Sequence, residues 1–148
     1  MTTTTHKRSV HIDAPVEKVF DYVKDPRHFW DAFPQSARGH DTMTDVSLTP
    51  DAGVGSTYRW KGSMFIFHIE GVSTREEYIP NERFVDRSST GPVWTFTFEP
   101  DPTGTTLSLA FEYSTKVPLM DKVVDRVAWN GDEDLDKMLA NLKRATET

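Results

Sequence analysis

Apolar residues recur at steps of three or four near the end of the chain. The residues that share this stripe are Met120, Val123, Val124, Val127, Gly131, Leu135, Met138 and Leu142. This spacing predicts one long amphipathic helix over 118–146, with charged residues on its other faces. At about 1.5 Å per residue such a helix is about 40 Å long. Because helices of this length are not stable in water by propensity alone, it requires a large apolar partner surface.

The dipeptide Asn130-Gly131 interrupts this helical pattern, and Asn130 with Glu133 has the spacing of a capping box. Two arrangements are therefore open: a helix that kinks here, or two segments that meet at Gly131. In either arrangement, Gly131 serves packing or leaves room for a ligand beneath the helix. Trp129 falls opposite the apolar stripe.

A short strand and a first helix are predicted near the N-terminus. Val10 and Ile12 alternate with polar residues, which is typical of a strand. The helix begins at Pro15 or Val16, with Asp13 as its N-cap. A second short helix follows the next Asp-Pro dipeptide and covers 26–33. Its large aromatic residues are Phe29, Trp30 and Phe33.

From residue 38 onward the period of apolar residues changes to two, which predicts about six strands separated by short turns. One of these turns is placed at Gly62-Ser63. The clearest alternation gives one strand Trp94, Phe96 and Phe98, and the next strand Leu107, Leu109, Phe111 and Tyr113. Short hairpin loops imply antiparallel neighbours. The fold class is therefore α+β: a curved antiparallel sheet of about seven strands wrapped around the long C-terminal helix, with two short helices after the first strand. Space left between sheet and helix forms a pocket.

The strand over 64–70 is apolar on both faces, so its register is open. If Met64 and Ile66 point inward, His68 and Glu70 point inward as well, and a His–carboxylate pair in an apolar pocket is suited to acid–base chemistry. If the alternate residues Phe65, Phe67 and Ile69 point inward, the pair faces solvent. The bulk of these three residues favours the second register.

Several other charged residues are candidates for chemistry. Arg59 and Lys61 are read as a solvated strand face, and Arg75, beside two glutamates, is read in the same way. An inward arginine, by contrast, would anchor a carboxylate or enolate. Asp86, which shares a strand face with Phe84, is a similar candidate for a charged residue that points inward. The histidines show no ligand spacing, so neither a metal site nor a cofactor is expected.

Composition narrows the class of protein. The chain has 148 residues, a net charge of −6 and no cysteine. This balance argues against a nucleic-acid partner, and the absence of cysteine suits a reducing cytoplasm. No apolar run approaches the roughly 20 residues of a membrane span, so no integral membrane association is expected. Residues 1–8 are predicted to be a flexible tail and 9–146 a single domain, as a monomer or homodimer.

Three motifs carry a resemblance to a known family. They are VHIDAPVEKVFDYV at 10–23 (followed by Asp25 and Phe29-Trp30), GVGSTY at 53–58 and YIPNERF at 78–84. Together with the closing helix they resemble the START-like, or Bet v 1-like (SRPBCC), helix-grip superfamily, in particular its bacterial polyketide cyclase/dehydrase and lipid-transport branch. The match covers nearly the whole chain. Trp30 lies where aromatic cyclases of this family carry a pocket tryptophan, and those cyclases have a tyrosine a few residues later. Here residues 34–37 read PQSA, which departs from that pattern.

The resemblance implies a deep apolar cavity between sheet and long helix that holds a lipid, polyketide-like or aromatic molecule. The residues expected to line it are Trp30, Phe33, Tyr58, Trp60, Phe67, Trp94, Phe96, Phe111, Met120, Val124, Val127 and Gly131. Three functions are compatible with the sequence. The first is a binding or carrier protein for a hydrophobic small molecule. The second is a cyclase/dehydratase-type enzyme that uses His68, Glu70 or an inward arginine, with Arg59 as one candidate. The third is an interaction module with an exposed Trp129.

Overall fold

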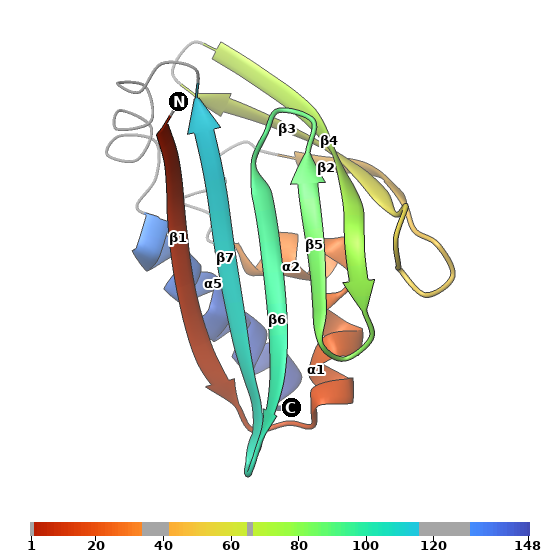
Figure 1. The fold of residues 1–148 in the computed structure, drawn as a ribbon, viewed down its shortest axis with the longest axis vertical. Coiled ribbons are helices and arrows are strands. Elements are labelled where there is room, and N and C mark those ends of the chain that lie inside the picture. The colour runs from red at the N-terminus through yellow and green to blue at the C-terminus, as the bar shows by residue number, and fades with distance from the viewer. Residues whose placement is uncertain (1, 34–41, 65–66, 116–130) are drawn as a thin grey trace.

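The computed structural model describes residues 2–33, 42–64, 67–115 and 131–148 (Figure 1). Its helices are α1 (Val16–Val23), α2 (Pro26–Ala32) and α5 (Gly131–Thr146). Its strands are β1 (Thr2–Ile12), β2 (Thr42–Ser47), β3 (Thr57–Met64), β4 (Phe67–Ile79), β5 (Arg83–Ser88), β6 (Val93–Asp101) and β7 (Gly104–Thr115). The order of elements and the α+β class predicted from the sequence are confirmed.

The seven strands form one antiparallel sheet in the order β1-β7-β6-β5-β4-β3-β2. Consecutive strands from β2 to β7 are neighbours, as the short turns predict, while β1 pairs with the last strand. The three described helices lie together on one face of the curved sheet (Figure 1). The turn placed at Gly62-Ser63 is wrong, because β3 continues to Met64 and pairs there with Phe67.

The N-terminal segment is part of the sheet rather than a tail. The expectation of a flexible tail over 1–8 is wrong for the described residues, since all of β1, from Thr2 to Ile12, pairs with β7. Its polar side chains find partners on α5: the Arg8 guanidinium donates to both carboxylate oxygens of Asp136 at 2.8 and 2.9 Å. His6 Nδ1 lies 3.1 Å from Asp132. These contacts hold a strand whose first half has no apolar pattern of its own.

Helix α1 begins without a side-chain cap, because Pro15 occupies the N-cap position. The expectation that Asp13 caps this helix is therefore wrong. Asp13 instead contacts His11 through its carboxylate, and its backbone N–H donates to Glu147 at 2.8 Å. Helix α2 is capped by Asp25, whose side chain accepts the Arg27 backbone N–H at 3.0 Å.

The described part of the C-terminal helix begins at Gly131. Its buried residues include Leu135, Met138 and Leu142, as the predicted stripe requires, and also Leu139, which the stripe does not contain, with Asp134 and Thr146. The first half of the predicted helix, with Met120, Val123, Val124, Val127, Trp129 and Asn130, lies outside the described residues. Lys143 and Arg144 lie in the last turn, where cations interact favourably with the helix dipole.

An aromatic cluster forms the centre of the core between the sheet and helices α1 and α2. Phe84 stacks on Phe96 with ring centroids 4.6 Å apart, and both side chains are fully buried. Phe20 of α1 meets Phe84 edge-on at 6.1 Å, and Phe29 of α2 lies 5.0 Å from Phe96. Such tilted and edge-on pairs add to the stabilisation from burial. The cluster fixes α2, and thereby one wall of the site described next.

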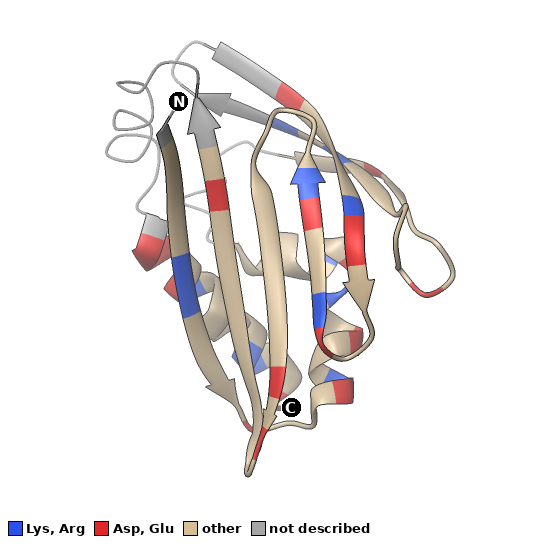
Figure 2. Cartoon of the chain, in the orientation of Figure 1, with Lys and Arg blue, Asp and Glu red and all other residues tan. Residues whose placement is uncertain are grey.

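Strands β4 and β5 carry several acidic and basic residues (Figure 2), and some of them form exposed ion pairs between the two strands. Arg87 on β5 pairs with Glu76 on β4 at 3.0 Å, and Arg83 pairs with Glu77 at 3.0 Å. All four side chains are close to half exposed, so each pair contributes at most about 1 kcal/mol. These cross-strand pairs mark the outer face of the sheet.

Candidate functional site

An aromatic pocket lies between the sheet and helices α2 and α5. Its volume is about 200 Å³. Every described strand from β3 to β7 contributes a side chain. The lining residues are Phe29, Trp30, Phe33, Tyr58, Trp60, Ser73, Ser88, Pro92, Trp94, Phe111 and Met138. Most of this lining is aromatic, which favours a flat apolar ligand.

Strand β3 places Tyr58 and Trp60 on the pocket side, because alternate residues of a strand point to the same face. Trp60 lies across the neighbouring strand, opposite Gly71. A Cβ atom at Gly71 would lie 3.0 Å from the Trp60 ring, closer than nearly all Cβ contacts in proteins. The glycine therefore provides the space that the indole occupies.

The opposite wall is a second aromatic pair. Trp94 of β6 and Phe111 of β7 are cross-strand partners, and their ring centroids are 4.2 Å apart. Phe33, directly after α2, meets Trp94 edge-on at 6.0 Å. Cross-strand aromatic pairs of this kind stabilise the sheet and present a continuous ring surface. The pocket is thus closed on two sides by packed rings.

The polar groups of the pocket wall belong to β3, β4 and β5. The Tyr58 hydroxyl donates to Asp86 at 3.0 Å, and the Trp60 indole N–H donates to Ser88 at 3.2 Å. Burial is the main cause that raises the pKa of Tyr58 well above its ordinary value, followed by the charge of Asp86. The phenol therefore remains protonated at neutral pH.

Asp86 is held by a buried arginine. Arg75 Nε and one terminal nitrogen donate to the two carboxylate oxygens at 2.8 and 3.1 Å. The other terminal nitrogen donates to the carbonyls of Ala52 and Lys24 at 2.6 and 2.9 Å. The guanidinium also lies 4.0 Å from the centre of the Phe84 ring. Arg75 thus joins the end of α1, the β2–β3 loop and the sheet.

The expectation that Arg75 faces solvent is wrong, since its side chain is only 1 % exposed. The reason is a bulge in β4, where the pairing with β5 shifts between Arg75 and Glu77. Ser73 and Arg75 point inward, Glu76 and Glu77 are both exposed, and the alternation then resumes with the other parity. Arg75 is therefore an inward arginine, but Asp86 and two carbonyls occupy its donors.

The structure brings together half of the residues expected to line the cavity: Trp30, Phe33, Tyr58, Trp60, Trp94 and Phe111. Phe96 is instead buried in the core cluster, and the surroundings of Gly131, where the described part of α5 begins, lie outside what the structure describes. Met120, Val124, Val127 and the Phe67 side chain lie outside the described residues. Sequence reasoning missed Phe29, Ser73, Ser88, Pro92 and Met138 as lining residues.

Two of the three catalytic candidates lie away from the pocket. Glu70 is paired with Lys61 at 3.9 Å, and both side chains are about 60 % exposed, at 62 % and 59 %. Arg59 pairs with Asp45 at 3.4 Å on the same outer face. These placements correct their assignment as acid–base candidates. The His68 side chain lies outside the described residues, and no cluster of three or more His, Asp or Glu suited to a metal occurs among the residues that were described.

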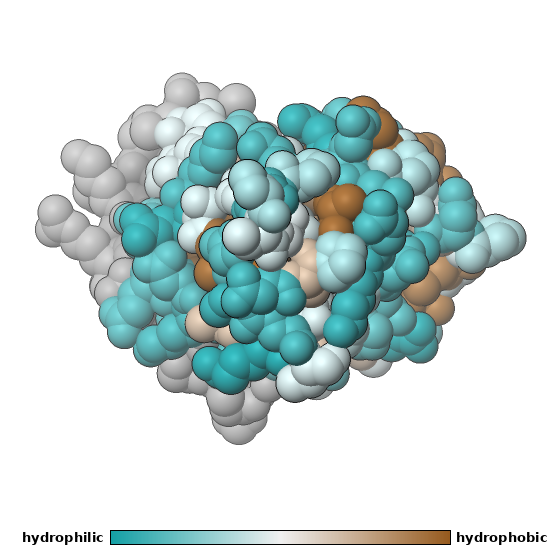
Figure 3. Space-filling view, turned by 90° about the horizontal axis from the view of Figure 1, so that it is seen from below, coloured by the Kyte–Doolittle hydropathy of each residue, from teal (hydrophilic) through white to brown (hydrophobic). Residues whose placement is uncertain are grey.

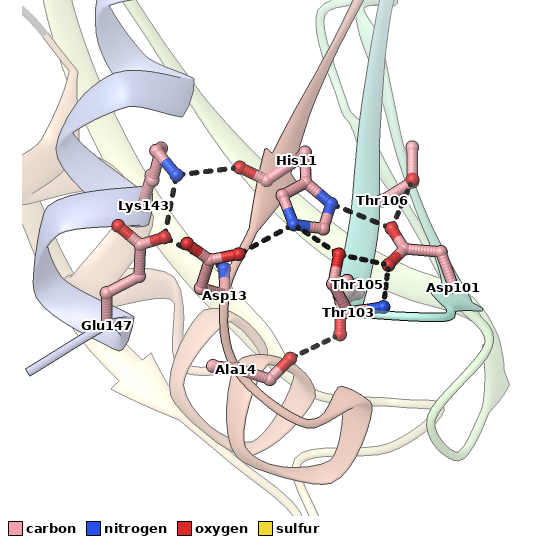
Figure 4. Close-up of polar contacts among 9 residues, drawn as sticks. All are labelled: His11, Asp13, Ala14, Asp101, Thr103, Thr105, Thr106, Lys143 and Glu147. Atoms are coloured by element: carbon pink, nitrogen blue, oxygen red, sulfur yellow. Dashed lines mark hydrogen bonds and ion pairs between the residues drawn. The ribbon is translucent and has the colours of Figure 1, made fainter.

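A second polar cluster lies at the other end of the sheet, around the β6–β7 hairpin (Figure 4). The two ring nitrogens of His11 contact Asp101 and Asp13, each at 2.8 Å. Lys143 donates to the His11 carbonyl at 3.0 Å and to Glu147 at 2.6 Å. Seen from this end, the molecular surface is mostly hydrophilic (Figure 3). The cluster ties the end of β1 to the hairpin and to the end of α5.

The His11 cluster predicts a pH-dependent contribution to stability. The hydrogen bonds to Asp13 and then Asp101 raise the pKa of His11. The stabilisation from the charged imidazole is therefore fully present below the unfolded pKa of about 6.5 and is lost as pH rises through the higher folded pKa. We expect urea unfolding at pH 6 and pH 9 to show a stability gap between wild type and His11→Gln that narrows at pH 9. A gap that stays constant or widens would contradict this assignment.

The fold and the site together define a class. A curved seven-stranded sheet that holds a C-terminal helix and an aromatic pocket is the architecture of the START-like, or Bet v 1-like, superfamily. Within it, the chain belongs to the polyketide cyclase/dehydrase and lipid transport family, which matches residues 3–147. No curated protein matches the sequence. None of the described helices is long and apolar enough to cross a membrane.

Solved structures agree with this fold. The chain is similar to the KanY protein (ms6282), with 19 % identity, complete coverage of both chains (100 % each) and a TM-score of 0.73. It is similar to TTHA0849 from Thermus thermophilus, with 17 % identity over 98 % of this chain and 97 % of that one, and a TM-score of 0.66. Ara h 8.0201 shares 12 % identity over 98 % of each chain, with a TM-score of 0.62. At these identities the likeness concerns the fold alone.

Proposed function

We propose that this protein binds and carries a small hydrophobic molecule, built on one or two aromatic rings, in the pocket between the sheet and helices α2 and α5. The aromatic lining of the pocket is the observation that carries this proposal. A volume of about 200 Å³ is below the range of about 300–1,000 Å³ typical of drug-sized sites. The size therefore favours a compact ring system over a long-chain lipid.

Carriage is favoured over catalysis by the state of the buried charges. Arg75 and Asp86 neutralise each other and direct their hydrogen bonds to protein groups. Glu70 and Arg59 lie on the solvent side of the sheet. The described part of the pocket wall thus offers rings and hydroxyl groups rather than an acid–base pair. A chain without cysteine suits a reducing compartment, so the proposal includes a cytoplasmic location. It also includes a monomeric or homodimeric state.

Two measurements test the binding proposal. Native mass spectrometry of the purified protein, followed by denaturation, identifies any ligand that copurifies. Titration with the neutral fluorescent probe N-phenyl-1-naphthylamine measures uptake directly. We expect Trp94→Leu to weaken probe binding about tenfold, because one aromatic wall is lost. The control Val54→Ala, at an exposed site outside the pocket, leaves binding unchanged. Absence of probe uptake by the folded wild type would refute the proposal.

A second candidate function is the ring-forming or dehydrating chemistry named by the family. It is favoured by the Tyr58 hydroxyl, which lies at the pocket wall and is held by Asp86. Incubation with a polyketide-like poly-ketone substrate, followed by mass spectrometry, distinguishes conversion from simple binding. Conversion by wild type that is lost in Tyr58→Phe would favour the enzyme over the carrier.

A further inference from the structure

One row of residues crosses the pocket wall from β3 to β5. Tyr58 is the cross-strand partner of Ser73, and Ser73 is the partner of Ser88. All three line the pocket, and each is less than 5 % exposed, at 4 %, 2 % and 4 %. The direction of their hydrogen bonds decides what this wall can offer a ligand.

The Tyr58 hydrogen points away from the pocket. A phenol carries a single hydrogen, and the structure assigns it to Asp86 Oδ2, 3.0 Å away. Asp86 is ion-paired with Arg75 and is therefore an acceptor only. The Tyr58 oxygen consequently has only lone pairs left.

Ser88 also has no hydrogen to offer. Its oxygen accepts the Trp60 indole N–H at 3.2 Å and the Thr90 backbone N–H at 3.3 Å. With both lone pairs engaged, the Ser88 hydroxyl donates its own hydrogen to the Thr90 hydroxyl oxygen, 2.9 Å away. The Trp60 indole N–H already donates to Ser88 and is therefore not available to a ligand. Hydroxyl groups linked in this way polarise one another and keep a common direction.

We infer that this wall selects a ligand that carries a hydroxyl or amine hydrogen, as a phenol does, and that the Tyr58 oxygen accepts this hydrogen. The inference rests on the proposed binding function and specifies its ligand. A ring substituted only with an ether or ketone oxygen leaves the Tyr58 lone pairs without a donor. Trp30 and Trp94, on the other walls, carry indole N–H groups that suit a ligand's acceptor atoms.

The test compares three ligands of one shape: naphthalene, 1-naphthol and 1-methoxynaphthalene. Each competes with N-phenyl-1-naphthylamine for the wild-type protein. We expect 1-naphthol to bind about tenfold more tightly than either of the others, the effect of one well-made hydrogen bond. The methyl ether keeps the oxygen and loses the hydrogen, so it isolates the donor. Equal affinity for the naphthol and its ether overturns the inference and leaves the binding function intact. Absence of probe uptake and of binding by all three ligands overturns both.

One variant and a matched control assign the effect to a residue. Tyr58→Phe is expected to reduce the naphthol preference from about tenfold to within about twofold. The matched control is Tyr78→Phe, which removes a hydroxyl that donates to the Asp51 carbonyl outside the pocket and keeps the full preference. If Tyr58→Phe does not fold, the wild-type ligand series still decides the question. Full preference in a folded Tyr58→Phe contradicts the inference.

Discussion

Replacement of Arg75 by methionine is expected to lower the free energy of unfolding by about 3–5 kcal/mol. Methionine has a similar length but leaves the Asp86 carboxylate buried, charged and without its bidentate partner. It also removes the donor that joins the carbonyls of Ala52 and Lys24. Urea or guanidinium unfolding followed by circular dichroism measures the loss.

Two controls separate the buried charge from loss of an arginine side chain. Arg87→Met removes an arginine of the neighbouring strand whose ion pair with Glu76 is about half exposed, at 52 % and 47 %, so a loss below about 1 kcal/mol is expected. The double variant Arg75→Met/Asp86→Asn removes the uncompensated charge, so it should recover part of the stability lost in Arg75→Met. A double variant that is less stable than Arg75→Met would disprove this explanation.

Gly104→Ala is expected to destabilise the protein by about 3 kcal/mol, the upper part of the usual cost of overpacking. A Cβ atom at Gly104 would collide with the carbonyl oxygen of Ile12 and would lie 3.0 Å from the Ala14 backbone nitrogen. Both neighbours are backbone atoms at the end of β1, so neither can rotate away. Relief requires β1 and the β6–β7 hairpin to separate. Thermal unfolding by calorimetry measures the change.

The adjacent substitution Thr103→Ala provides the control for Gly104→Ala. It lies in the same hairpin and removes hydroxyl contacts with Asp101 and His11 at 3.4 and 3.2 Å, but it introduces no collision. Because Thr103 is exposed, a loss well below that of Gly104→Ala is expected, about 0.5 kcal/mol. Equal losses for the two variants would show that general disruption of the hairpin, rather than the close approach, is responsible.

The sequence predicts a strand best where one face of that strand is solvent-exposed and the other is buried. Trp94, Phe96 and Phe98 alternate with polar residues, and that alternation predicts β6. The same rule cannot predict the first half of β1, because Thr2 to Arg8 carry no apolar alternation and their pairing with β7 depends on residues about 100 positions away, such as Arg8 with Leu109. A local pattern does not contain such a partner.

The pocket shows a similar division. Its aromatic residues on β3, β6 and β7 follow from alternation, but a period of two does not identify Ser73, Ser88 and Arg75 as inward residues. The bulge at Glu76 changes which residues of β4 face the core, so a strict period of two cannot be carried through the strand. Two consecutive glutamates followed by Tyr78 are the signal for this break. Met138 belongs to the predicted helix stripe, but its place in the pocket depends on how α5 crosses the sheet.

The pairing of β1 bears on how the chain can be shortened. The threonine-rich start looks dispensable, yet its removal would leave the Leu109–Thr115 half of β7 as a new, unprotected sheet edge. Exposed backbone N–H and C=O groups on such an edge recruit strands from other molecules. Trimming these residues to aid crystallisation would therefore favour aggregation and domain exchange.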